Sequence, residues 1–312
     1  MRRLPSVESE YPIPDSDRYL VLLNPNAAGG QRDVLRRRIA GAMASHRVPF
    51  DIVESTSVED GLRVVHAAVE AGCKAVVAAG GDGTIALALR GTAGSDVPVA
   101  LLPFGTGNQL ALNFGVPVSL EDSVRVAVEG ETERNDLGRI GDEYFALIAG
   151  AGLDAEVMAS ATSELKSRLG VLAYLVGGLK HVVTPSRTTY HIVADEQEIE
   201  VEASMVLLAN AGIIGAGGLP VELKVAPRTS FQDGLLDVAI FAPRHLPDMA
   251  AMLTRVVFQK YSGDDRMIFL QARKVSVQSD PPVAAQIDGE PRGETPIVAE
   301  IVPSAGRILV PR

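Results

Sequence analysis

Gly80-Gly81-Asp82-Gly83-Thr84 stands between two short apolar runs, residues 75–79 and 85–89. The first run is typical of a buried strand and the second of a helix. Glycines let the main chain approach a ligand closely, and the next helix offers unpaired N–H groups, the positive end of its dipole and Thr84 as a cap. This suits a phosphate, but Asp82 would repel one unless a metal ion lies between them. The stretch therefore predicts a site for metal-bound polyphosphate; the alternative is that Asp82 only caps its turn.

Composition limits the possible partners. The chain has 312 residues, of which 46% are hydrophobic and only 4% aromatic, so it can form a large aliphatic core and two domains. The net charge of −10 and the pI of about 5.1 argue against nucleic acid and against strong non-specific attraction to anionic lipid. The single cysteine, Cys73, excludes an internal disulfide and fits a reducing cytosol.

The first half of the chain alternates short apolar strands with helices. Strands are expected at residues 19–23, 50–53, 75–79 and 97–102, and helices at residues 34–45, 58–71 and after the glycines. Such alternation predicts a parallel sheet, which binds ligands at the carboxyl ends of its strands. Loops 24–30, 80–84 and 104–108 follow three of these strands, so we expect them to open on one edge as a nucleotide cleft.

From about residue 136 the pattern changes to strands separated mostly by turns. They are expected at residues 144–148, 188–193, 198–208, 236–241, 267–278, 283–287 and 297–302, with helices at 165–183 and 246–259. This succession predicts an antiparallel sandwich or barrel. Residues 1–17 are expected to be a flexible tail, and no stretch approaches the length of a membrane span.

Six motifs follow one another along the chain. They are NP at 24–25, GGDGT at 80–84, PFGTGN at 103–108, GAGLD at 150–154, SFQDGLLD at 230–237 and DGE at 288–290. In this order and at these spacings the chain resembles the bacterial diacylglycerol kinase and lipid kinase family, which is related to sphingosine kinases. GGDGT alone is shared with NAD kinases and loosely with phosphofructokinases, whereas the later motifs favour lipid kinases. The resemblance covers about residues 19–310.

The resemblance implies a fold and an activity. An N-terminal three-layer α/β domain with a parallel sheet, similar to that of NAD kinases, would span residues 18–137 and be joined by a C-terminal strand, 305–312. An antiparallel β-sandwich would span 138–304, with ATP between the domains. The implied activity is ATP- and Mg²⁺-dependent transfer of the γ-phosphoryl group to a lipid hydroxyl, most simply diacylglycerol to give phosphatidic acid. The protein would be cytoplasmic, peripheral to the inner membrane face, and a homodimer by analogy.

Residue by residue, the resemblance implies three sets of site residues. The nucleotide-binding set is Asn24, Pro25, Asn26, Gly29, Gly30, Ser55, Gly80, Gly81, Asp82, Gly83, Thr84, Gly105, Thr106, Gly107 and Asn108. The catalytic set is Asp82, Asp288 and Glu290, with either Asp288 or Glu290 as proton acceptor. The metal set is Ser230, Asp233 and Leu235 around a structural Mg²⁺, with Asp136 in the same charge network.

Local patterns alone leave alternatives open. DGE is also an ordinary hairpin turn, the acidic turn around Asp233 also fits a plain turn before a strand, and Thr106 could simply cap a helix. If the strand before DGE continues, its alternation places Asp288 and Glu290 on the same side. Lys166, Arg168 and Lys180 belong either to a solvated helix face or to a lip at the lipid entrance.

The chain departs from the family pattern at three places. Ala86-Leu87 replaces Asn-Glu, Gln109 replaces Asp, and the first glycine loop is one residue longer and lacks a basic residue before Arg32. These changes remove polar positions expected in the cleft. Two other functions therefore stay open: a kinase for a soluble alcohol such as NAD, and a nucleotide- or lipid-binding regulator that has lost activity.

Overall fold

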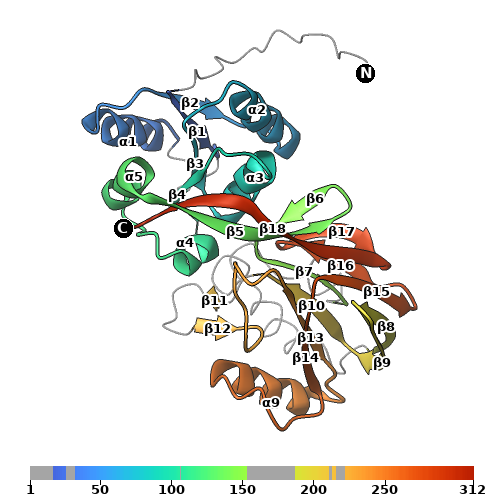
Figure 1. Cartoon of the computed structure of the whole chain (residues 1–312). Helices are drawn as coiled ribbons and strands as arrows, with labels where there is room; N and C mark the ends of the chain where they lie inside the picture. The colour runs from blue at the N-terminus through green and yellow to red at the C-terminus, as the bar shows by residue number, and fades with distance from the viewer. Residues whose placement is uncertain (1–16, 26–31, 106, 153–186, 211–212, 216–221) are drawn as a thin grey trace, which may run out of the picture.

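The computed structural model describes residues 17–25, 32–105, 107–152, 187–210, 213–215 and 222–312. Figure 1 shows one region in which helices surround a sheet and a second region built mainly from strands. The last strand, β18 (Ile297–Val310), runs from the second region back into the first. This α/β architecture with an antiparallel second part confirms the fold class expected from the sequence.

The first region is built on parallel strands. They are β1 (Tyr19–Leu23), β2 (Phe50–Glu54), β3 (Ala75–Gly80) and β4 (Val99–Pro103). Their order is β2-β1-β3-β4, and all neighbouring pairs are parallel. Their carboxyl ends therefore lie at one edge of the sheet, as the sequence predicted.

Helices cover both faces of this sheet and complete three layers. Helices α1 (Arg32–Ser45) and α5 (Leu120–Glu129) pack on one face, and α2 (Val58–Glu70) and α3 (Asp82–Thr92) on the other. Side chains of strand β1 point alternately to the two faces of the sheet. Val21 belongs to the core with α1 and α5, whereas Leu20 and Leu22 belong to the core with α2 and α3. The sequence analysis did not predict α5, and it considered a helix after Thr106, where the short helix α4 (Gln109–Asn113) lies, only as one that Thr106 could cap. No helix in the described ranges is long and apolar enough to cross a membrane.

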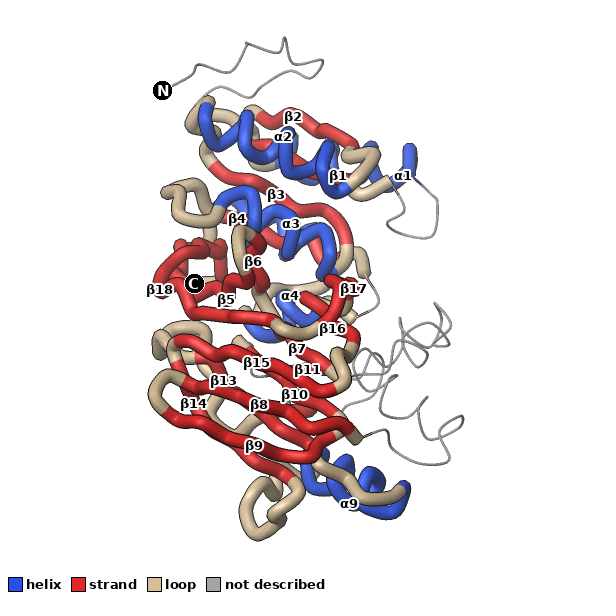
Figure 2. Tube along the Cα trace, turned by 90° about the vertical axis from the view of Figure 1, so that its right-hand side faces the viewer, coloured by secondary structure: helices blue, strands red, loops and turns tan. Residues whose placement is uncertain are grey.

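The second region stacks two sheets. One has the order β14-β13-β10-β7-β16-β17. Its strands are β7 (Ile148–Ala151), β10 (Met205–Ala209), β13 (Leu236–Phe241), β14 (Met267–Ala272), β16 (Ala284–Ile287) and β17 (Glu290–Glu294). The other continues the first sheet through β18 into β15 (Lys274–Asp280), β8 (Thr188–Ala194) and β9 (Gln197–Ala203). In Figure 2 the strands of this region run side by side, and buried, mostly aliphatic side chains of both sheets form the core between the two sheets.

Three predicted single strands are in fact pairs. Residues 198–208 divide into β9 and β10, and residues 267–278 into β14 and β15, with each pair split between the two sheets. Residues 144–148 divide into β6 (Glu143–Phe145) and β7. The chain changes sheets at Ser204 and Arg273 without glycine or proline. The sequence therefore carries no turn signal there, although the two sheets require the break.

Two long strands join the regions. The unpredicted β5 (Glu131–Ile140) pairs with β18 along most of its length, and β18 also pairs with β4 and β15. A register shift interrupts β18 between Val302 and Gly306, where Ser304 has a φ of 55°. The domain boundary expected from the sequence, between residues 304 and 305, therefore lies inside one continuous strand.

A small third sheet pairs β11 (Ile213–Gly215) with β12 (Glu222–Lys224).

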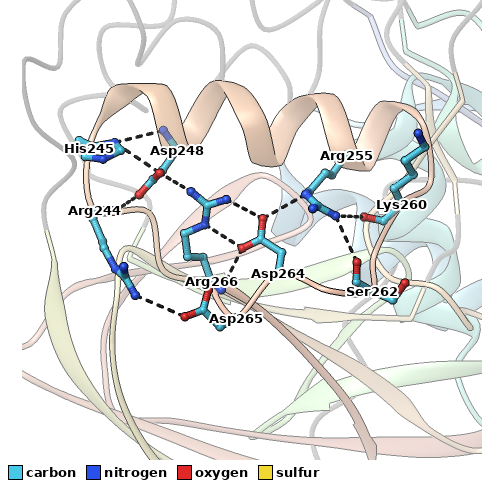
Figure 3. Close-up of polar contacts among 9 residues, drawn as sticks. All are labelled: Arg244, His245, Asp248, Arg255, Lys260, Ser262, Asp264, Asp265 and Arg266. Carbon is cyan, nitrogen blue, oxygen red and sulfur yellow. Dashed lines mark hydrogen bonds and ion pairs between the residues drawn. The ribbon is translucent and has the colours of Figure 1, made fainter.

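An ion-pair network anchors α9 (Leu246–Val257) to the loop before β14, as Figure 3 shows. The Asp264 carboxylate, only 2% exposed, accepts two hydrogen bonds of 2.7 Å from Arg266 and lies 3.1 Å from Arg255 Nε. The same Arg266 also pairs with Asp248 in the first turn of α9. The hydrogen bonds from Arg266 lower the pKa of Asp264 to about 2.

Replacing Asp264 with Asn should destabilise the protein at neutral pH. The folded pKa of about 2 lies below the ordinary 3.8, so this carboxylate stabilises the fold above pH 3.8 and ceases to do so as the pH falls through 2. The shift corresponds to about 2 kcal/mol at pH 7. Urea unfolding of both proteins at pH 7 and near pH 2.5 checks this. An equal difference at both pH values would contradict it.

Candidate functional site

Three loops meet at the carboxyl edge of β1, β3 and β4. The backbone N–H of Asn24 donates to Ala79 O at 3.0 Å, and that of Phe104 donates to Gly80 O at 2.9 Å. Pro25 follows Asn24, and Ser55 stands at the same edge after β2, since its N–H donates to Leu23 O at 3.3 Å. The single edge expected from the sequence is therefore present. The predicted site residues Asn26, Gly29, Gly30 and Thr106 lie outside the described residues.

Close contact between two loops explains most of the glycines. A Cβ added to Gly105 would lie 2.6 Å from Gly81 Cα, and one added to Gly80 would lie 2.3 Å from Thr84 Oγ1. Gly83 differs, because no described residue lies within 4 Å of the position of its added Cβ and it is exposed in the first turn of α3. Packing therefore requires Gly80, Gly81 and Gly105. The fold has no such need at Gly83, where the backbone is open to a ligand.

Thr84 does not cap α3 as the sequence suggested. Gly81 is the N-cap residue and has no side-chain cap, so the first amides of α3 keep their capacity to bind an anion. Thr84 is buried instead, and its Oγ1 accepts a 3.2 Å hydrogen bond from Asn24 Nδ2. Thr84 therefore links the loop after β1 to the loop after β3.

Asp82 reaches across to the third loop. Its Oδ1 accepts a 3.0 Å hydrogen bond from the backbone N–H of Leu110 at the start of α4. A Cβ on Gly107 would lie 3.2 Å from Asp82 Oδ2, so only glycine leaves that oxygen free space. Asn108, at a φ of 47°, closes the loop by accepting from Gly105 N–H at 2.9 Å. Burial raises the pKa of Asp82, although the amides of α4 oppose this. The carboxylate is thus fixed between α3 and α4.

Asp288 belongs to a hairpin and also reaches a neighbouring loop. Asp288 and Gly289 both have positive φ, 48° and 87°, as a two-residue turn between β16 and β17 requires. The Asp288 carboxylate accepts hydrogen bonds of 2.8–3.0 Å from the backbone N–H groups of Ala146, Leu147 and Ile148. Burial raises the pKa of Asp288, and the negative charge of Asp82 raises it further. The two carboxylates therefore interact although they come from different regions of the fold.

Glu290 differs from Asp288 in its surroundings. The expected alternation fails because the strand turns at Asp288 and Gly289, so Glu290 is the first residue of β17 and is exposed. Asp288 can therefore be part of a hairpin turn and still reach a neighbouring loop with its carboxylate.

Asp136 organises the loop 230–235. Its Oδ2 accepts from Gly234 N–H and its Oδ1 from Ser304 N–H, both at 2.8 Å, and it is buried. Burial raises the pKa of Asp233, and the Asp136 charge contributes. Ser230 and Leu235 flank this pair in the same loop, and the Ser230 hydroxyl accepts from Gln232 N–H. The loop and Asp136 thus form one acidic unit. In the described residues no three His, Cys, Asp or Glu side chains gather closely enough to hold a metal ion by themselves.

Sequence reasoning missed the residues that connect these parts. The buried amide nitrogen of Asn210 donates to the carbonyls of Asp136 and Ala146 at 2.9 and 3.0 Å. Phe231 packs on Phe114 at the end of α4, with ring centroids 4.5 Å apart. Asn210 follows the fully buried β10 directly, so a polar residue at the end of an apolar strand was the signal that could have found it.

One of the three departures from the family pattern, Ala86-Leu87, occupies packing positions. Ala86 and Leu87 are both 7% exposed, and Leu87 belongs to the core between the sheet and α2. A Cβ added to Gly61 would lie 2.9 Å from Leu87 Cδ1, so the two residues are complementary in size. Ile85 is also fully buried, so its side chain cannot face a nucleotide.

Two other predictions fall outside the described residues. They are the helix 165–183 with its basic lip, and Asp154 of the GAGLD motif.

Comparisons with known proteins agree with this geometry. Residues 18–140 match the family model of the diacylglycerol kinase catalytic domain. Residues 148–310 match that of the YegS C-terminal NAD kinase beta sandwich-like domain. The chain belongs to the diacylglycerol and lipid kinase family. The division between the two family models falls between β5 and β7, in the stretch that contains β6.

Individual relatives of this lipid kinase family member support the assignment. A diacylglycerol kinase of Bacillus subtilis is 26% identical over 89% of this chain and 91% of its own length. An uncharacterized Synechocystis protein is 29% identical over 76% of this chain, which spans only 54% of that relative. The crystal structure of a diacylglycerol kinase from Bacillus anthracis superposes with a TM-score of 0.78 at 21% identity, covering 94% of this chain and 97% of that one. This structural likeness shows that the two proteins share a fold.

Proposed function

We propose that this lipid kinase family member transfers the γ-phosphoryl group of ATP to a lipid hydroxyl in an Mg²⁺-dependent reaction. Diacylglycerol is the first candidate acceptor, with phosphatidic acid as product. The observation that carries the proposal is the placement of two carboxylates by backbone amides, Asp82 in the glycine-rich strand end and Asp288 in the hairpin of the second region. Phosphoryl transfer needs little more from a protein than positioning and charge neutralisation, which such an arrangement can supply.

The chain's own groups can bind and orient the nucleotide. The uncapped start of α3 and the open backbone at Gly83 suit the phosphates of ATP, and Asn24 and Gly105 hold the adjoining loops in place. Asp82 provides oxygen ligands for a cation, and the negative charge of Asp288 favours a cation near them. When bound there, Mg²⁺ would supply neutralisation of the phosphate charge.

A second, structural Mg²⁺ fits the loop 230–235. Asp136 and Asp233 are close enough for the first to raise the pKa of the second, and such repulsion is relieved by a cation. The backbone carbonyls of Ser230 and Leu235 and water would complete an oxygen set, since two carboxylates alone are too few. This ion would stiffen the loop that packs on α4 through Phe231.

We assign the proton acceptor role to Asp288. The lipid hydroxyl oxygen would attack the γ-phosphorus, its proton would pass to a carboxylate oxygen of Asp288, and ADP would leave. Two features support Asp288 over Glu290: three backbone amides fix its orientation, and burial raises its pKa toward the range useful for a base. Glu290 is exposed at the start of β17.

Transfer of label from [γ-³²P]ATP with Mg²⁺ into a panel of mixed-lipid micelles tests the proposal, beside NAD as a soluble acceptor and an Asp82→Ala protein. A labelled lipid that disappears in the variant is the expected result and names the acceptor. Labelled NADP would instead favour the soluble-alcohol kinase. Nucleotide binding without any labelled product would favour a regulator. Cytoplasmic location at the inner membrane face and a homodimer remain predictions of the family resemblance.

A further inference from the structure

One carboxylate receives two arginines from different elements. Glu143, the first residue of β6, accepts from Arg90 Nη1 at 2.9 Å through its Oε1. Arg292 Nε donates to both Glu143 oxygens, at 2.9 and 3.0 Å. The side chains are 21–32% exposed, so water screens these pairs less than it screens pairs on the open surface.

The two arginines belong to the two halves of the candidate site. Arg90 lies in the last turn of α3, the helix whose first residue is Asp82. Arg292 lies in β17, immediately after the hairpin turn that carries Asp288. A helix is rigid over the roughly 12 Å between Asp82 and Arg90, so fixing one end fixes the other.

A second set of contacts holds the same segment from its other end. The amides of Ala146, Leu147 and Ile148 follow β6 directly and bind the Asp288 carboxylate. Residues 143–148 are therefore held to the hairpin through Glu143 with Arg292 and through the amides with the Asp288 carboxylate, and the Asp288 N–H also donates to Ile148 O at 2.8 Å. The ion pair of Glu143 with Arg90 joins the same segment to α3.

The geometry points to Glu143 as a positioning residue that sets the separation between Asp82 and Asp288. This positioning role of Glu143 rests on the phosphoryl transfer proposed above. Loss of the Glu143 charge would leave two adjacent guanidinium groups that repel each other, so α3 and the hairpin would separate slightly. Misplacement of reacting groups by about 1 Å can reduce a rate by about 100-fold.

The test compares Glu143→Gln with Glu300→Gln. Glu300 is the matched control because it forms a similar partly exposed pair with Arg139, on β18 and β5, but contacts neither α3 nor the hairpin. We expect Glu143→Gln to lower kcat about 10- to 100-fold with KM for ATP changed by less than about twofold. Glu300→Gln should leave both unchanged. Arg90→Gln combined with Glu143→Gln should cost little more than Glu143→Gln alone, because both act through one contact.

Amide hydrogen exchange gives a readout that does not depend on activity. Exchange of the Ala146–Ile148 amides should be faster in Glu143→Gln than in the wild type and unchanged in Glu300→Gln. If the two variants behave alike in both exchange and kcat, the positioning role is wrong. If the wild type transfers no phosphoryl group to any acceptor, the proposed function fails, and the exchange result alone decides whether Glu143 positions the hairpin.

Discussion

Replacing Asp288 with Asn is expected to lower kcat for lipid phosphorylation by about 1,000-fold, in the range that a general base contributes. The amide cannot accept the hydroxyl proton, although it keeps one oxygen for the amides of residues 146–148. The acidic limb of the pH–rate profile should also disappear. A base works only when deprotonated, so wild-type activity should rise with pH through the pKa of Asp288, which burial raises above its ordinary value. Steady-state kinetics across pH with micellar diacylglycerol measures both.

Two control variants separate this effect from structural damage. Asp195→Asn is matched in structure, because Asp195 is another turn aspartate at positive φ, 53°, whose carboxylate accepts backbone N–H groups of Arg273 and Lys274. It should leave kcat unchanged. Glu290→Gln should cost less than about tenfold. A larger loss in Glu290→Gln than in Asp288→Asn would transfer the proton acceptor role to Glu290.

Replacing Gly83 with Ala should weaken ATP binding about 100-fold while the fold becomes slightly more stable. Within the described part of the chain nothing lies within 4 Å of the added Cβ, so the methyl group clashes with none of these residues. Alanine in a helix is favoured over glycine by up to about 1 kcal/mol. If the phosphates approach this backbone, the methyl group would displace them and cost two charge-assisted hydrogen bonds, at about 1.5 kcal/mol each.

Gly41→Ala is the matched control for this prediction. Gly41 lies in α1, is exposed, and likewise has nothing within 4 Å of an added Cβ. Both variants should melt at or above the wild-type temperature, but only Gly83→Ala should lose affinity for a non-hydrolysable ATP analogue in titration calorimetry with Mg²⁺. Equal affinities in the two variants would show that phosphates do not approach α3 at this point.

The sequence was most informative where local chemistry decides the structure. Apolar runs that end in Gly80-Gly81 and Gly105 predicted both the strands and the shared edge of their loops, because neighbouring parallel strands end at the same side of a sheet. It was least informative where the chain changes sheets at Ser204, since nothing in β9 or β10 marks the break. The surroundings of Ala86-Leu87 could not be predicted either, because burial of Leu87 against Gly61 depends on how α2 packs on α3.

The sequence by itself thus determined the fold class and the family, through motifs that are local in the chain. It predicted Asp82 as one candidate carboxylate and left the other open between Asp288 and Glu290. Only the tertiary structure decided what those carboxylates contact. Asp82 binds an amide 28 residues away and Asp288 binds amides up to 142 residues away. Glu143 and Arg292 meet across 149 residues. Such partners depend on how the strands and helices pack together, and a local pattern of residue types contains no information about that packing.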